Sequence, residues 1–232
     1  MRVRVICAVV VLSAALPLAV AAGKGAAPKP KPGPARIVAL LEEIQAGLTS
    51  TKYQHVTRVD RRAGAYYFDC SGMAAWILKR AAPAAHAAVQ RPEGGRPLAV
   101  HYYRTIARIE PGKRRGPWLR VADAGQARPG DVIAWERPKW FDSKSTGHVA
   151  FVVGAPRAVA EPVPGVLVRV ADASKFRHED DSRPAGTTGF GTGVLLLPTD
   201  ARGQPTGYGW VGALTPEDWI VPAALVIGRP LR

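Results

Sequence analysis

Hydrophobic positions change their spacing part-way along the chain. Before residue 110, apolar residues recur every three or four positions at 37–48 and again at 98–109, as on one face of an α-helix. From residue 118 onward they form short runs or alternate with polar residues, which is typical of strands. Helical patterns followed by strand patterns predict an α+β domain, in which N-terminal helices pack on one face of a small antiparallel sheet or half-barrel.

The first part contains three predicted helices. The first has five apolar side chains on one face, namely Ile37, Leu40, Leu41, Ile44 and Leu48. The second follows Cys70 and is stopped by Pro83, and the third covers residues 98–109. Residues 52–65 and 83–96 are expected to be loops.

The second part contains six predicted strands, at residues 118–121, 132–135, 148–153, 166–172, 194–197 and 224–227. The segments between them are rich in proline, glycine or polar residues, and the loops are expected at residues 136–146, 155–165, 175–193 and 203–212.

The N-terminal segment has the composition of an export signal. Arg2 and Arg4 precede an apolar run that ends at the small residues 19–21, so residues 1–22 are interpreted as a signal peptide that is removed. Residues 23–35 are a spacer rich in proline and lysine, and residues 36–232 are expected to form one domain. The protein is therefore expected outside the cytoplasm, in the periplasm or the extracellular space.

The charge of the chain is strongly positive. Loss of the signal peptide lowers the number of basic residues from 32 to 30; against 18 acidic residues this leaves a net charge of +12. No nucleic-acid-binding motif accompanies this charge. An exported basic protein suits anionic polymers or lipid headgroups of the cell envelope, although a genomic bias toward arginine codons explains the charge equally well.

Cysteine usage points to one residue. Of the two cysteines, Cys7 lies in the signal peptide, so the mature chain keeps only Cys70, which has no internal disulfide partner. Asp69 is a good N-cap, so Cys70 is expected on the first turn of a helix, where the dipole favours a thiolate. Gly72 is expected to leave the backbone beside the sulfur open to a substrate. The alternative is a buried structural cysteine.

A nucleophilic thiol needs a base and a group that orients the base. Of the five histidines, His148 alone begins a strongly apolar strand, whereas His86, His101 and His178 are expected at the surface. If residues 148–153 pair in antiparallel fashion with residues 166–172, His148 lies beside Asp172. The Asp172 carboxylate would then hold one ring nitrogen of His148.

Four blocks of the sequence carry a resemblance to a known family. Asp69-Cys70-Ser71-Gly72, Arg128-Pro129-Gly130-Asp131, Gly147-His148-Val149 and Asp172-Ala173-Ser174 resemble the motifs of NlpC-type cell-wall cysteine peptidases. The resemblance implies a papain-like fold, in which the nucleophile lies on a helix and the histidine on a sheet.

The resemblance also implies a site and an activity. Cys70 would be the nucleophile, His148 the base and later the acid, and Asp172 the orienting group. The substrate would be a peptide-type amide in bacterial wall peptides, and no metal or cofactor would take part. The residues expected to contact the substrate are Tyr53, Asp69, Ser71 and Gly147.

The chain departs from the family pattern in three respects. It has Asp172 where the family usually has histidine, and it lacks the Gly-Gly pair that commonly precedes the nucleophile. The intervals from Cys70 to His148 and from His148 to Asp172 are also long for the family. A carboxylate still orients a histidine, so these departures bear on the shape of the substrate cleft.

Two other functions fit the same sequence. One is a non-catalytic domain that binds anionic envelope glycans through its positive charge. The other is a papain-like acyltransferase or an amidase that acts on a different amide. Six aromatic residues are expected either in the core or along a sugar-binding cleft, namely Trp118, Trp135, Trp140, Tyr208, Trp210 and Trp219.

Overall fold

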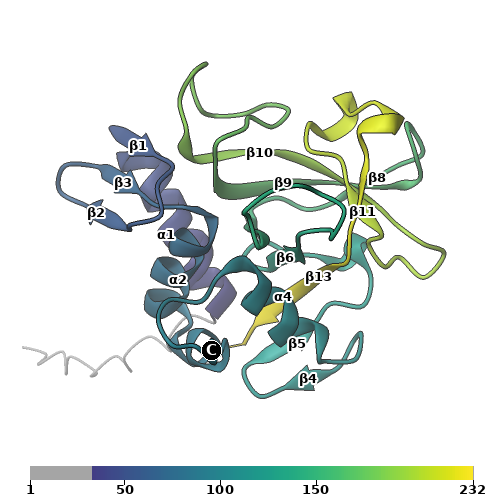
Figure 1. Cartoon of the computed structure of the whole chain (residues 1–232), viewed down its shortest axis with the longest axis horizontal. Coiled ribbons are helices and arrows are strands. Elements are labelled where there is room, and N and C mark those ends of the chain that lie inside the picture. Colours follow the sequence, from purple (N-terminus) through teal and green to yellow (C-terminus); the bar gives the residue numbers. More distant parts are fainter. Residues whose placement is uncertain (1–32, 232) are drawn as a thin grey trace, which may run out of the picture. The chain divides into compact units, whose positions relative to one another are not determined.

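A computed structural model describes residues 33–231 (Figure 1). The predicted signal peptide and most of the predicted spacer lie outside the described residues. The α-helices are α1 (Gly33–Gly47), α2 (Cys70–Ala81), α3 (Pro83–Ala88) and α4 (Ala99–Ala107). The strands are β1 (Ser50–Lys52), β2 (Arg58–Asp60), β3 (Ala65–Tyr67), β4 (Arg114–Arg115), β5 (Trp118–Arg120), β6 (Val132–Glu136), β7 (Gly147–Val152), β8 (Arg157–Val159), β9 (Gly165–Ser174), β10 (Gly189–Pro198), β11 (Gly207–Tyr208), β12 (Val221–Pro222) and β13 (Leu225–Pro230).

The main sheet is antiparallel throughout. Its strands follow the order β10-β9-β7-β6-β13-β5-β4, and β8 pairs with residues 165–167 at the start of β9. The C-terminal strand β13 lies inside the sheet, where it pairs with β5 on one side and with β6 on the other (Figure 1). The predicted mixed α+β class with antiparallel pairing is confirmed.

Helices cover one face of this sheet. Ile37, Leu41 and Ile44 of α1 are buried in the same core cluster as α2, α4 and the residues Val149 and Phe151 of β7. The intervening residues of β7 belong to a second cluster on the opposite face. Because both faces are covered, β6 and β7 are continuous apolar runs with little alternation.

Several segments differ from the expectations. Residues 33–35 of the predicted spacer form the first turn of α1. The predicted loop at 52–65 contains strands of the small sheet β1-β3-β2, and the predicted loop at 83–96 begins with α3. Pro83 stops α2 as expected but also starts α3, since proline suits the first turn of a helix.

The largest correction concerns β10. Its first half lies in the predicted glycine-rich loop, and it pairs with β9 along ten residues from Gly189 to Pro198. The alternating glycines Gly189, Gly191 and Gly193 leave one side of the first half of this strand without side chains. The 175–188 loop uses that space, because a Cβ at Gly191 would meet Arg183 and one at Gly193 would meet His178.

None of the helices among residues 33–231 is long and apolar enough to cross a membrane.

A buried ion pair fixes the turn that leads into β6. Asp131 has no exposed surface and accepts hydrogen bonds at 2.8 Å from Nε and Nη2 of Arg229 on β13. The backbone N–H of Arg128 donates to the same carboxylate. Burial raises the pKa of Asp131, and the hydrogen bonds from Arg229 and Arg128 oppose that rise.

We therefore expect Arg229→Ala to lower the free energy of unfolding by about 3–5 kcal/mol, since it leaves a buried carboxylate without its partner. Arg104→Ala is the matched control, because Arg104 pairs with Glu136 at the surface and is expected to cost less than about 1 kcal/mol. Urea unfolding measures both. Equal losses in the two variants would contradict the assigned role of Arg229.

Candidate active site

Cys70 is the first residue of α2, as predicted. Asp69 has an extended backbone (φ −87°, ψ 175°), and its Oδ1 accepts the N–H of Gly72 at 2.6 Å, which is the geometry of an N-cap. The Cys70 side chain therefore lies at the positive end of the helix dipole, and the residue is 7% exposed. The residues after it are good helix formers and pack in the core.

Gly72 has a different role from the one expected. A Cβ at this position would lie 2.6 Å from Oγ1 of Thr57. Glycine is thus needed to let the chain at Thr57 approach α2. The Thr57 side chain therefore fills the space at Gly72 that was expected to be open to a substrate.

The cap residue takes part in a network that sequence reasoning missed. Arg96 donates to both oxygens of Asp69 at 2.9 Å and to Oγ of Ser71 at 2.7 Å. Burial would raise the pKa of Asp69, but the hydrogen bonds from Arg96, His55 and Gly72 outweigh it and lower the pKa. Asp69 and Ser71 line the pocket, yet their polar atoms are engaged within the protein.

His148 follows Gly147, the first residue of β7, and only glycine fits at position 147. Gly147 has φ +131°, and a Cβ there would lie 1.9 Å from the carbonyl oxygen of Trp135. His148 is 9% exposed, and its Nε2 lies 2.7 Å from Oδ2 of Asp172. Its other ring nitrogen, Nδ1, is therefore free of Asp172 and can interact with the Cys70 thiol.

The charge state of His148 follows from its surroundings. Burial alone would lower the pKa of His148, but the charge of Cys70 and the hydrogen bond to Asp172 outweigh it and raise the pKa to about 10. The ring is therefore an imidazolium at neutral pH, placed between a sulfur and a carboxylate. This arrangement is typical of an activated thiol.

Asp172 lies on β9, and the antiparallel pairing of β7 with β9 was predicted correctly. The register pairs Phe151 with Ala171 and Val152 with Val170, which places His148 and Asp172 as diagonal neighbours rather than as a direct pair. Asp172 has no exposed surface. Burial would raise its pKa, but the charge of His178 and the hydrogen bonds from both histidines hold it well below its usual range.

Two histidines expected at the surface are buried. Nδ1 of His101 accepts the backbone N–H of Leu98 and so caps α4, which no sequence pattern indicated. His178 is also buried, and its Nε2 lies 3.0 Å from Oδ2 of Asp172. The charged residues around His178 indicate a solvated loop. In the structure, Gly191 and Gly193 of β10 leave room for this loop to pack against the strand.

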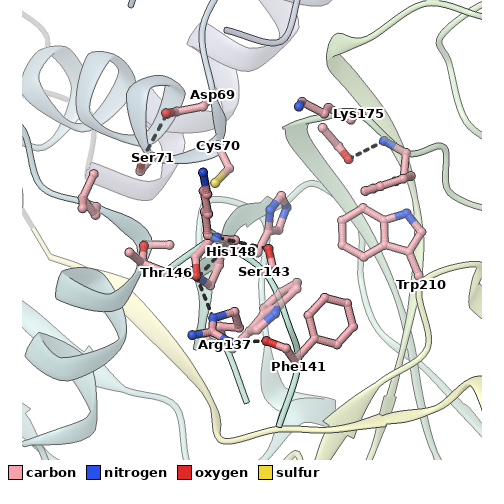
Figure 2. Close-up of a pocket in the computed structure, with 18 of the residues that line it drawn as sticks. Asp69, Cys70, Ser71, Arg137, Phe141, Ser143, Thr146, His148, Lys175 and Trp210 are labelled. Atoms are coloured by element: carbon pink, nitrogen blue, oxygen red, sulfur yellow. Dashed lines mark hydrogen bonds between the residues drawn. The ribbon is translucent and has the colours of Figure 1, made fainter. Parts of the chain in front are cut away.

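Cys70 and His148 open into one cleft of about 650 Å³, which is a usual size for a substrate site. Figure 2 shows their side chains in this cleft, with Trp210 and Lys175 on the opposite side from Ser71. Tyr53 lines the cleft, as expected. Burial and the charges of Cys70 and Asp69 raise the pKa of Tyr53, so its hydroxyl stays protonated and can donate.

The walls of the cleft combine aromatic and basic side chains. Besides Tyr53 and His148, the aromatic ones are Trp135, Phe141, Phe176, Tyr208 and Trp210, and the basic ones are His55, Arg137, Lys144 and Lys175. Of the six aromatic residues considered from the sequence, Trp118 is a core residue, and Trp140 and Trp219 are exposed. The core expectation is therefore confirmed for Trp118, and Trp135, Tyr208 and Trp210 line the cleft.

Among residues 33–231, no group of three or more histidine, cysteine, aspartate or glutamate side chains is arranged to hold a metal ion.

We expect Asp172→Asn to slow alkylation of Cys70 by iodoacetamide at pH 7 by about tenfold or more, because the amide no longer stabilises the His148 imidazolium that pairs with the thiolate. Mass spectrometry of the peptide that contains Cys70 follows the reaction. Asp180→Asn, at an exposed position, is the matched control. An unchanged rate in Asp172→Asn would show that the carboxylate does not support the thiol.

The chain was compared with protein-family models, with curated proteins and with solved structures. No family model, no curated protein and no solved structure matches it. What the site does is therefore inferred from its own residues.

Proposed function

We propose that the protein is an exported cysteine hydrolase that cleaves peptide-type amide bonds. The observation that carries this proposal is that Cys70 and His148 line one cleft, with the thiol at a helix N-terminus and the histidine held from behind by the buried Asp172 carboxylate. Each group has the neighbour that its chemical role requires.

The first half of the reaction forms an acyl-enzyme. The Cys70 thiolate attacks the carbonyl carbon of the amide, and the carbonyl oxygen becomes an oxyanion. Backbone N–H groups at the start of α2 and the Tyr53 hydroxyl are the donors available to this oxyanion. The His148 imidazolium then gives its Nδ1 proton to the leaving nitrogen, the C–N bond breaks, and a thioester remains on Cys70.

The second half releases the acid. Neutral His148 takes a proton from water, and the resulting hydroxide attacks the thioester carbonyl. The C–S bond breaks, the acyl group leaves as a carboxylic acid, and the thiolate and the imidazolium are restored. Asp172 stays ionised throughout and stabilises each imidazolium form.

A papain-like fold of the NlpC type is the finer architecture that we propose. Its support is the order of the parts: a nucleophile on the first turn of α2, a histidine at the start of β7 and an acidic partner on β9, with α2 packed on the sheet. The proposed substrate is a stem peptide of bacterial peptidoglycan. The basic side chains around the cleft suit a peptide that carries carboxylates.

We expect the purified chain to release defined products from muropeptides, and Cys70→Ala and His148→Ala to lose this cleavage by at least about a thousandfold. Liquid chromatography with mass spectrometry identifies the bond that is cut. His86→Ala on α3 is the control for His148→Ala, since His86 lies outside the cleft.

Two outcomes would end the proposal. Cleavage retained in Cys70→Ala would remove the thiol from the mechanism. Wild-type protein that binds the wall without cutting it, and Cys70→Ala that binds equally well, would support the glycan-binding function instead.

The raised pKa of His148 determines how kcat/KM is expected to change with pH. A raised pKa keeps the ring protonated to higher pH, so the general acid remains available up to its pKa of about 10 and is lost above it. We expect kcat/KM for the cleaved peptide to hold at alkaline pH and to fall only near pH 10. A fall that begins near the ordinary histidine value of about 6.5 would contradict the charge assignment.

A further inference from the structure

His178 has acceptors on both of its ring nitrogens. Its side chain has no exposed surface, and its Nε2 lies 3.0 Å from Oδ2 of Asp172. Its Nδ1 lies 3.0 Å from the backbone carbonyl oxygen of Trp210. Neither a carboxylate oxygen nor a carbonyl oxygen can donate a hydrogen bond, so each ring nitrogen must supply its own proton. A neutral ring would turn a lone pair toward one of these oxygens.

We propose that His178 is a fourth member of the site, a positioning residue that acts as a buried imidazolium and holds the Asp172 carboxylate for His148. This inference rests on the hydrolase function proposed above. His178 lies beyond Asp172 and does not line the cleft, so it acts on the reaction only through Asp172 and Trp210.

The charges of the site support this assignment. A Cys70 thiolate, a His148 imidazolium and an Asp172 carboxylate together carry one net negative charge in a buried place. A positive His178 makes the row of four groups neutral, which lowers the cost of burying it. Arg183 lies farther off, 3.8 Å from Oδ1 of Asp172, and its closest carboxylate is that of Asp181.

The fold holds His178 from several sides. Its backbone N–H donates to Oδ2 of Asp181 at 2.7 Å, which fixes the turn. Its ring packs on that of Trp210, with centroids 4.4 Å apart and a tilt of 31°, a contact that favours a cation. Gly193 of β10 lies against its Cβ, where any side chain would push the ring away.

The charged groups around His178 come from two segments, β9 and the loop that carries His178 itself. Asp172 faces it from β9, and Asp181 and Arg183 lie in its own loop. Glu179 is its chain neighbour and turns its carboxylate to the backbone N–H of Ala213. Asp172 is thus the only one of these carboxylates that accepts a hydrogen bond from the ring.

Loss of this positive charge has a defined consequence. With a neutral residue at position 178, the negative charge of Asp172 is no longer compensated. The protonated forms of His148 and Cys70 are then both favoured. A thiolate in the same site becomes less favourable for the same reason. The pH range over which Cys70 reacts should therefore move upward, whereas a residue that only fills space would leave that range in place.

The test uses His178→Gln in the full chain, because a glutamine amide can donate to Asp172 without carrying a charge. The rate of Cys70 alkylation by iodoacetamide is measured from acidic to alkaline pH. We expect the acidic limb of this profile to move up by roughly one pH unit. His86→Gln, on α3 and outside the cleft, is the matched control and should leave the profile unchanged.

An unchanged or downward-shifted profile in a folded His178→Gln protein would overturn the proposal, even if the variant were less stable. If the variant does not fold, ¹⁵N-histidine NMR of the unaltered chain decides. Two protonated ring nitrogens on His178 at neutral pH are expected, and a neutral tautomer would overturn the assignment. Neither measurement needs a substrate, so failure of the wall-peptide assay would leave this result standing.

Discussion

The site depends on one buried carboxylate. Asp172 has no exposed surface, and a single oxygen of its side chain receives hydrogen bonds from His148 at 2.7 Å and from His178 at 3.0 Å. A buried carboxylate is costly unless donors and positive charges surround it. Here the donors are the two imidazole rings, so the same contacts that make Asp172 tolerable also fix His148 beside Cys70.

The fold supplies this arrangement from separate parts of the chain. α2 begins with Cys70, which lines the cleft. His148 lines it from the second position of β7, and Asp172 lies on β9. The C-terminal segment contributes Trp210, whose ring lies 5.2 Å from that of His148 and whose carbonyl oxygen accepts from His178. Trp210 thus both lines the cleft with its side chain and holds His178 behind the cleft with its backbone.

The sequence predicts the central row because each member has a local signal. Asp69 before an apolar helix indicates the cap, Gly147-His148 begins a continuous apolar run, and Asp172 ends the predicted strand that pairs with it. The two apolar runs are consecutive along the sequence except for the connection at 153–164, and antiparallel pairing of such runs brings His148 close to Asp172.

The supporting residues have no such signal. Arg96 lies in a segment expected to be a loop, and it reaches Asp69 across 27 residues. His178 lies among charged residues, which normally indicate solvent. The one clue was the alternation of Gly189, Gly191 and Gly193, because glycines within a strand often mark a place where another segment approaches closely. Short strands such as β1 and β2 were missed because three residues carry no periodicity.

NMR titration of the His148 ring in the wild type and in Cys70→Ala tests whether Cys70 and His148 form an ion pair. We expect the His148 ring to stay protonated to about pH 10 in the wild type. Its pKa should fall clearly when the sulfur is removed, because the charge of Cys70 is one of the causes of the raised pKa. Identical titration of His148 in both proteins would contradict the ion pair and, with it, the assignment of a hydrolase.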